Sequence, residues 1–271
     1  MRSGDERLGR SPEEVRRRGA SRGPEDVGRA RASGPLEGAR DDARTEGASV
    51  RAVDIPPPPA APPGGDRWGG SLGDELRSLV RSNLRRFERR RIRLTGGRRR
   101  AAVAIALLDA DTNPAILIIK RVNRGRHAGQ WAFPGGVVEP GERAATAALR
   151  EAFEEVGLER ADVVGPLDDI LTGTGFIITP VVMFAATTSR LRRNADEVHS
   201  LHRVGLTRLV AAGMPRWVRD DSGHELLQYP LRHDMVVYAP TGAILWQFAE
   251  VALRGRTIRV ADLRQPAFAM Q

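Results

Sequence analysis

Three glutamates lie close together in the sequence at a spacing that could hold a metal ion. Glu151, Glu154 and Glu155 occupy positions i, i+3 and i+4, so on a helix they share an arc of about 100°. Like charges at this spacing cost roughly a few tenths of a kcal/mol per pair, and a divalent cation would remove that cost. Carboxylate oxygens are the ligands that Mg²⁺ and Mn²⁺ prefer. The spacing therefore fits a metal-dependent phosphate site, although composition alone favours a solvated glutamate face.

The elements that must position these glutamates are a helix and a glycine-rich turn. Apolar periodicity predicts a helix over residues 142–156, which Gly157 ends in a left-handed conformation. Upstream, Gly135 and Gly136 have no Cβ, so their backbone can approach a ligand closely. Glu142, at the start of the helix, can point back toward the same region. The apolar stripe expected to face the core consists of Leu149, Ala152, Phe153 and Val156.

The spacing of residues 136–158 resembles the signature of the Nudix hydrolases. Gly136 is followed after five residues by Glu142, and after seven more by the run Arg-Glu-Ala-Phe-Glu-Glu-Val-Gly at residues 150–157. Such a match specifies eight positions and is far more selective than a lone glycine motif. The resemblance covers 136–158 as a motif and about 100–256 in the order of elements.

This resemblance implies a fold class and a reaction. The fold would be α/β, a Nudix-type α/β/α sandwich with a mixed sheet. The reaction would be metal-dependent hydrolysis of a nucleoside diphosphate linked to another moiety, with Mg²⁺ or Mn²⁺ as cofactor and a small-molecule nucleotide as substrate. Metal ions would shield the anionic phosphoryl oxygens and make a water acidic enough to attack.

The resemblance also implies roles for individual residues. Glu151, Glu154 and Glu155 would hold the metal, and the Gly136 carbonyl is a further candidate ligand. Arg150 would orient the glutamates through charge-assisted hydrogen bonds. A general base must take the proton of the attacking water. Two candidates stay open for this role, Glu197 in a later loop and Glu151.

The sequence upstream of the signature resembles the coenzyme A pyrophosphatase branch of the family. Residues 120–136 read KRVNRGRHAGQWAFPGG, an Arg-rich loop followed by His-Ala-Gly-Gln and Phe-Pro-Gly-Gly, and residues 174–182 are similar to a second segment of that branch. The expected reaction is hydrolysis of coenzyme A or acyl-CoA to adenosine 3′,5′-bisphosphate and (acyl-)4′-phosphopantetheine. A broader pyrophosphatase acting on NADH or nucleotide sugars is the alternative. The residues expected to bind substrate are Arg121, Arg124, Arg126, Gly135 and Gly136.

Around this motif, strands and helices alternate. Apolar runs of strand length occur at 101–108, 115–120 and 176–185, and the first two are joined by turn-forming residues. Helical periodicity recurs at 243–253. This alternation indicates helices that cover a mixed sheet.

The chain divides into three regions by composition. Residues 1–70 are rich in Arg, Gly and Pro with few large apolar side chains, so we expect a disordered tail. Residues 71–95 predict a basic amphipathic helix with Ser71 or Asp74 as N-cap. Residues 96–271 would form the Nudix hydrolase domain.

The net charge of +9 raises the question of nucleic-acid binding. Residues 68–100 hold 11 Arg and three acidic residues, whereas 101–271 hold 19 basic and 19 acidic residues and are neutral. The charge therefore belongs to the helix region, where a solvated basic face is the simplest interpretation. The alternative is a nucleic-acid-associated protein that uses this Arg-rich helix and carries an inactive domain.

Composition also bounds the compartment and partners. The chain has no cysteine and no apolar run long enough to span a membrane, so we expect a cytoplasmic protein without a membrane partner. Nucleic acid is not the expected partner. A homodimer is compatible with the sequence.

Overall fold

The structure is a computed structural model that describes residues 51–52, 72–109, 113–124, 128–186 and 190–267. All of them belong to one compact unit, Glu46–Gln271. The expected N-terminal tail, 1–70, lies outside the described residues except for β1 (Arg51–Ala52), whose backbone pairs with β10 (Arg216–Arg219). None of the helices in the described ranges is both long and apolar enough to cross a lipid bilayer.

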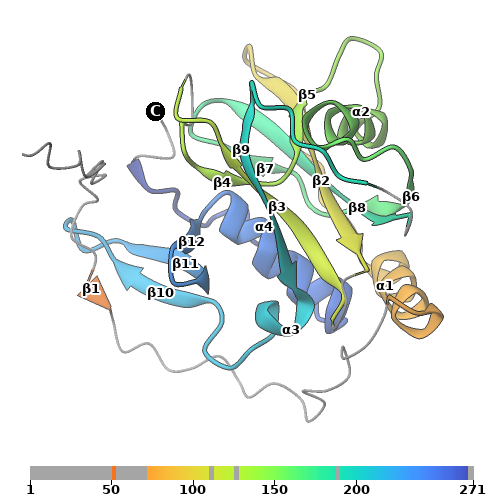
Figure 1. The fold of residues 1–271 in the computed structure, drawn as a ribbon. Coiled ribbons are helices and arrows are strands. Elements are labelled where there is room, and N and C mark those ends of the chain that lie inside the picture. Colours follow the sequence, from red (N-terminus) through yellow and green to blue (C-terminus); the bar gives the residue numbers. More distant parts are fainter. Residues whose placement is uncertain (1–50, 53–71, 110–112, 125–127, 187–189, 268–271) are drawn as a thin grey trace, which may run out of the picture. The chain divides into compact units, whose positions relative to one another are not determined.

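A mixed sheet forms the centre of the molecule (Figure 1). β2 (Arg99–Leu108) runs parallel to β8 (Phe176–Ala185) and antiparallel to β3 (Ala115–Arg121). β2 and β3 pair only at their joined ends, so at its other end β2 pairs with β5 (Gly135–Val137) instead. The remaining strands of this sheet are β4 (Trp131–Ala132), β6 (Ala161–Pro166), β7 (Ile170–Leu171) and β9 (Val198–Gly205).

Helices cover both faces of this sheet, because alternate side chains of its strands enter two separate cores. Ala102, Ala104 and Ala106 of β2 pack with α2 (Ala144–Val156). Ile105 and Leu107 belong instead to the core of the opposite face. That core contains α1, α4, η1 and a small antiparallel sheet. The bounds of these elements are α1 (Asp74–Arg86), α4 (Thr241–Phe248), the π-helix η1 (Ala249–Leu253), β10, β11 (Glu225–Arg232) and β12 (Met235–Tyr238), with the short α3 (Leu206–Leu209) after β9. The predicted α/β/α sandwich is confirmed.

Most predicted elements form within a few residues of their expected bounds, but the helix predicted over 71–95 is shorter, because α1 ends at Arg86 and Phe87 is extended. Strand 176–185 is β8, and the helix predicted over 142–156 begins later, at Ala144. The helix predicted over 243–253 is divided between α4 and η1. The N-cap expectation for α1 was wrong for Asp74, which is the first helical residue, because the extended backbone of Gly73 precedes it. Ser71 lies outside the described residues.

The basic face of α1 packs partly against the domain. The guanidinium groups of Arg77 and Arg81 lie 4.7 and 5.1 Å from the ring centroid of Phe184, and Arg81 also pairs with Asp162 of β6. Arginines stacked in this way cover apolar surface with their side chains. Two arginines of this basic face therefore dock the helix against the domain.

Two buried aspartates tie the segment after α1 to the rest of the domain. Asp169 accepts hydrogen bonds from the Thr179 hydroxyl at 2.6 Å and the Ile92 N–H at 2.9 Å, and it pairs with Arg89. Burial raises the pKa of Asp169, but these three donors outweigh burial and hold the pKa below its ordinary value. Asp168 pairs with Arg259 at 2.9 Å in the same region. The two aspartates together fix the loop that leads into β7 and the turn that follows β7.

We expect Asp169→Asn to destabilise the protein by about 1.5–3 kcal/mol, because it weakens the charge-assisted hydrogen bonds of a buried carboxylate whose partner Arg89 keeps 17% of its side chain exposed. Asp162→Asn is the matched control, since its ion pair with Arg81 is 58% exposed at the aspartate and contributes about 0–1 kcal/mol. Urea unfolding followed by circular dichroism measures both variants. Equal small losses would contradict a structural role for the buried pair.

Candidate active site

α2 carries the three glutamates, and it turns Glu151 and Glu155 toward the sheet while Glu154 is exposed. Its buried residues include Ala148, Ala152 and Glu155, whereas the side chain of Phe153 is 56% exposed. The prediction that Phe153 faces the core was therefore wrong. The reason is that the buried face of α2 includes Glu155, which finds polar partners beneath the helix. Gly157 ends the helix with a φ of +66°, as predicted.

Glu155 is a buried carboxylate with two partners. Only 1% of the residue is exposed, and its Oε2 accepts a hydrogen bond of 2.9 Å from the backbone N–H of Gly135. Its Oε1 lies 3.6 Å from a guanidinium nitrogen of Arg121. Burial raises the pKa of Glu155 to about 7, and the two partners oppose that rise only in part. The side chain therefore changes charge near neutral pH.

Arg150 connects the other acidic groups of the motif. Its Nη1 donates to Glu151 at 2.9 Å and to Glu154 at 3.2 Å. Its Nε and Nη2 donate to the two carboxylate oxygens of Glu142 at 3.2 Å each, and Nη2 also donates to the Val137 carbonyl at 3.0 Å. These bonds lower the pKa of Glu142 below its ordinary value. Arg150 thus contacts three carboxylates and the last residue of β5.

Gly136 is a glycine because Glu151 fills the space beside it. A Cβ at this position would lie 2.3 Å from a carboxylate oxygen of Glu151. The two residues therefore touch, and the backbone of Gly136 is adjacent to the acidic group. Burial raises the pKa of Glu151 above its ordinary value, and Arg150 opposes that rise.

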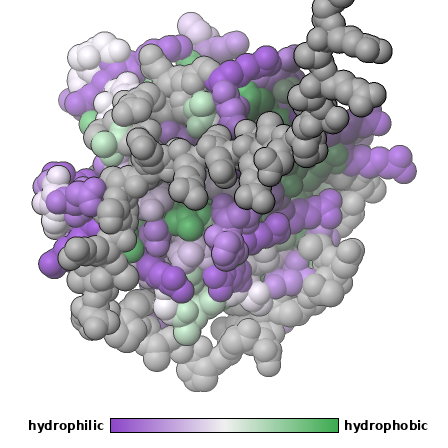
Figure 2. All heavy atoms as spheres, turned by 60° about the vertical axis from the view of Figure 1, so that its left-hand side comes forward, coloured by the Kyte–Doolittle hydropathy of each residue, from purple (hydrophilic) through white to green (hydrophobic). Residues whose placement is uncertain are grey.

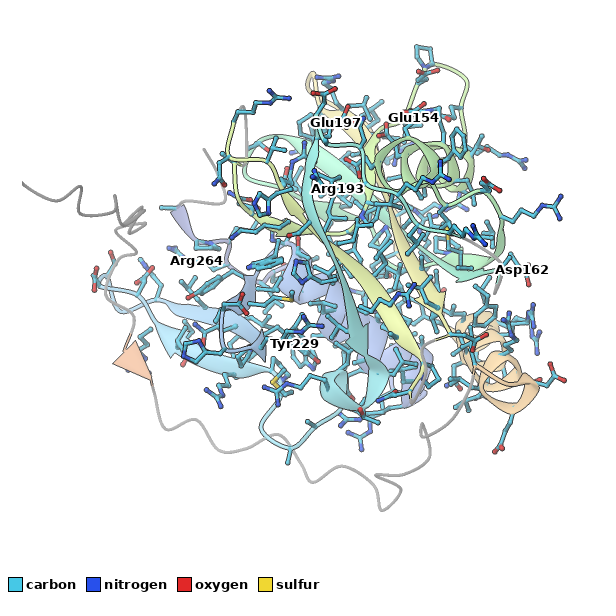
Figure 3. The ribbon with its side chains drawn as sticks, in the orientation of Figure 1. Glu154, Asp162, Arg193, Glu197, Tyr229 and Arg264 are labelled. Atoms are coloured by element: carbon cyan, nitrogen blue, oxygen red, sulfur yellow. The ribbon has the colours of Figure 1, made fainter. Side chains whose placement is uncertain are left out.

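Glu197 lies near the same acidic group, in the loop before β9. Figure 3 shows Glu197 and Glu154 at the same end of the molecule. Burial is the main cause of the raised pKa values of Glu151 and Glu155, and the nearby charge of Glu197 raises both a little further. The loop is fixed against α2 because the Asn194 N–H donates to the carbonyl of Glu155 at 2.8 Å. The structure therefore places Glu197, one of the two base candidates, near the carboxylates of the motif.

The three arginines expected to bind substrate have different surroundings. Arg121, at the end of β3, pairs with Glu155 and lines a pocket. Arg124 instead points to Asp196, 3.0 Å away, and both side chains are exposed. Arg126 lies outside the described residues. Of the two that can be placed, only Arg121 reaches the acidic group.

A pocket of about 400 Å³ adjoins the carboxylates. Gly135, Gly136 and Arg121 line it, and these residues contact Glu155 and Glu151 directly. Its other walls come from β2, β4, β5, the turn before β8, β8 itself and the start of α4, and those from β2, Thr172 and α4 lie outside the motifs singled out in the sequence. They consist of Arg99, Ala101, Val103, Gln130, Trp131, Ala132, Phe133, Val137, Thr172, Thr174, Phe176, Ile178, Pro240, Thr241 and Ile244.

The walls of this pocket are largely apolar, with a few polar groups among them. Figure 2 shows one face of the molecule, where the described hydrophobic surface is confined to small areas between hydrophilic residues. A concave, largely apolar pocket with a few polar groups is the usual form of a small-molecule site. The pocket can therefore receive an organic group of a ligand, while the adjacent carboxylates face a polar group of the same ligand.

The donor set fits a divalent cation. Oxygen ligands from carboxylates and a carbonyl suit Mg²⁺ and Mn²⁺, and burial leaves Glu151 and Glu155 with raised pKa values that a cation would lower again. In the described residues, no three acidic, histidine or cysteine side chains converge as a preformed cation site. Arg150 holds Glu151 and Glu154 in their present positions, so these side chains must reorient to share an ion.

Comparison with known proteins identifies the family. Residues 97–220 match the model of the NUDIX domain. The "Uncharacterized Nudix hydrolase NudL" of Citrobacter koseri is 38% identical over 137 residues, which cover 48% of this chain and 71% of the relative. NudL of Escherichia coli K12 is 34% identical over 146 residues, with coverage of 51% and 76%. The chain belongs to the Nudix hydrolase family.

A solved Nudix hydrolase from M. smegmatis, RenU, is 22% identical and superposes with a TM-score of 0.42, covering 61% of this chain and 92% of that one. As a member of the Nudix hydrolase family, the chain is a hydrolase, and members of this family generally use divalent metal ions. The range that matches the NUDIX model, 97–220, does not include α1 or α4, although the start of α4 lines the pocket.

We expect the metal-free protein to lose stability as the pH rises from about 4.5 to about 7. The folded state raises the pKa of Glu155 to about 7, so folding favours the protonated form. The stabilisation is complete when the pH is below the pKa of Glu155 in the unfolded state. It is lost as the pH rises through the pKa of Glu155 in the folded state, and the total loss in the free energy of unfolding is about 3 kcal/mol. Urea unfolding in EDTA across this range measures the slope.

Glu155→Gln should remove most of this pH dependence, because the amide does not titrate. Glu154→Gln is the matched control, since Glu154 is exposed and lies one residue away on the same helix. A slope that persists in Glu155→Gln would contradict the assignment of the raised pKa to Glu155.

We expect Gly136→Ala to fold and to lose activity by about tenfold or more, because the new methyl group must displace the flexible end of Glu151. Gly135→Ala provides the contrast. A Cβ there would lie 2.4 Å from the Ala102 carbonyl oxygen, a backbone atom, so this variant should lose stability. Thermal unfolding and initial rates distinguish the two, and full activity in Gly136→Ala would contradict the contact.

Proposed function

We propose that this Nudix hydrolase cleaves coenzyme A or acyl-CoA to adenosine 3′,5′-bisphosphate and (acyl-)4′-phosphopantetheine. The observation that supports this proposal is the pocket that adjoins the carboxylates through Arg121 and the glycine pair. A pyrophosphate bound at the carboxylates would have one of its two organic substituents beside this pocket. Side chains such as Phe133, Ile178 and Ile244 would suit an organic substituent with apolar parts.

The glutamates of the motif would hold Mg²⁺ or Mn²⁺ in this proposal. Glu151, Glu154 and Glu155 would supply carboxylate oxygens, with the Gly136 carbonyl as a further ligand. When bound, the ion would shield the phosphoryl oxygens and make a water acidic enough to attack. Arg150 would keep its role of orienting the carboxylates through the bonds that it already makes to two of them.

A carboxylate of the chain would then accept the proton that the attacking water releases. The oxygen of water adds to one phosphorus, and the bond from that phosphorus to the bridging oxygen breaks with its electrons on the oxygen. A carboxylate accepts the proton of the water. Glu197 is our preferred base because its charge reaches both Glu151 and Glu155 while its own carboxylate is exposed and not tied to Arg150. Glu151 is the second candidate.

Arg121 would bind a phosphoryl oxygen of the same linkage. Its guanidinium lies at the boundary between the pocket and Glu155. An arginine in this position can leave a carboxylate for a phosphate, because both accept its paired N–H donors. The exposed Arg124, held by Asp196, is less suited to this role.

A substrate panel with purified protein tests this function. With Mg²⁺ or Mn²⁺ present, we expect coenzyme A and acyl-CoA to be hydrolysed with higher kcat/KM than NADH and nucleotide sugars. A preference for NADH or nucleotide sugars would favour the broader pyrophosphatase instead. The absence of any metal-dependent turnover, together with salt-dependent nucleic-acid binding, would favour the Arg-rich helix as the working part.

Variants of α2 connect this activity to the proposed ligands. Glu151→Gln and Glu155→Gln should each reduce kcat by a factor of about 10² or more while the circular dichroism spectrum is unchanged, because each removes a carboxylate ligand from the metal. Glu159→Gln is the control, since this exposed glutamate lies just beyond the same helix. Near-normal turnover in both site variants would contradict the assigned roles.

A further inference from the structure

Arg99 is an arginine of the pocket that the proposed reaction does not use. It is the first residue of β2, and its side chain, with those of Ala101 and Val103, lines the pocket. Alternate residues of a strand share a face, which explains why these three do so. Val103 pairs with Gly135 and Arg99 pairs with Phe176. The pocket therefore extends along β2 from Val103, beside the glycine pair, to Arg99. These two positions are four steps apart on the strand, about 13 Å.

Arg99 is exposed, and its guanidinium lies against an aromatic ring instead of a carboxylate. It lies 5.2 Å from the ring centroid of Phe176, which also lines the pocket. Among the described residues, no ion pair or side-chain hydrogen bond engages this guanidinium. Its neighbour Arg100 differs, because it bonds to the Ile92 carbonyl at 2.8 Å and lies 3.4 Å from Asp169. A positioned arginine without an acidic partner has its donors available for an anion.

Two hydroxyl groups lie in the wall of the same pocket. Thr172 and Thr174 belong to the turn before β8, and their Oγ1 atoms are 2.9 Å apart. The Thr172 hydroxyl is also bonded to the backbone of Phe176, which fixes the turn beside the ring that Arg99 covers. Arginine and threonine are common ligands of phosphate oxygens. This end of the pocket therefore combines a cation with hydroxyl donors.

We propose that Arg99 binds a phosphate monoester that the substrate carries on its nucleoside, separate from the scissile pyrophosphate. This proposal rests on the proposed function and assigns the 3′-phosphate of coenzyme A to Arg99, not to Arg121 or Arg124. Arg121 pairs with Glu155 at the opposite end of the pocket, where the pyrophosphate would lie. Arg124 pairs with Asp196 and is not part of the pocket wall. Arg99 is therefore a specificity-determining residue.

The first test compares coenzyme A with dephospho-coenzyme A, which lacks the 3′-phosphate. The wild-type enzyme should prefer coenzyme A in kcat/KM. Arg99→Ala should lower kcat/KM for coenzyme A by about 10- to 100-fold, mainly through KM, because a charge-assisted bond is lost. The loss for dephospho-coenzyme A should be far smaller. Arg99→Lys should retain part of the preference, since it keeps the charge without the paired donors.

Arg98→Ala is the matched control. It removes the same charge from the adjacent exposed residue, which does not line the pocket. This variant should behave like the wild type on both substrates. Equal losses on the two substrates in Arg99→Ala, or no loss on either, would overturn the proposal.

A binding measurement separates this proposal from the proposed function. Isothermal titration without metal compares adenosine 3′,5′-bisphosphate with AMP. The wild type should bind the bisphosphate about tenfold more tightly, and Arg99→Ala should remove that difference. If coenzyme A is not hydrolysed but this difference is found and lost in Arg99→Ala, the reaction is wrong and the phosphate site stands. If the wild type binds both nucleotides equally, or binds neither, the phosphate site is wrong whatever the enzyme hydrolyses.

Discussion

The site depends on a carboxylate that is buried beneath α2. Glu155 is removed from water, where its charged form would be stabilised, and in exchange it contacts the Gly135 N–H and the Arg121 guanidinium among the residues that the structure describes. These partners compensate burial in part, so the pKa of Glu155 remains near neutrality. The same contacts connect α2, β5 and the end of β3. A group that is costly to bury thus fixes the three elements around the place where a phosphate would bind.

The divergence of two strands creates the room beside that carboxylate. β2 and β3 are joined by hydrogen bonds only near their connection, and farther along β2 pairs with β5 while β3 pairs with β4 and β9. Side chains of β2 on one face pack under α2, and those on the other face line the pocket or enter the second core. The acidic group and the apolar pocket are therefore adjacent but distinct in chemistry, which suits a substrate with a charged linkage and an organic substituent.

Segments beyond the matched domain complete this arrangement. The start of α4 supplies one wall of the pocket, and α1 packs against η1 and β6 in the core of the same face. Asp169 binds the segment after α1, and Asp168 pairs with Arg259 in the C-terminal part of the chain. Both aspartates lie close to the turn that contains Thr172 and Thr174. Packing and buried ion pairs thus make the additional elements part of the pocket's support.

The sequence by itself determined the acidic motif and most of the elements. Spacing located Glu151, Glu154, Glu155 and Arg150 on one helix, because these relations are local and follow from helical periodicity. Tertiary structure decided the rest: that Glu155 is buried while Phe153 is exposed, that Arg124 turns to Asp196, and that Arg99 and α4 share a pocket with the glycine pair. The physical reason is that the helix orientation depends on what lies beneath it, and pocket walls come from segments far apart in the chain.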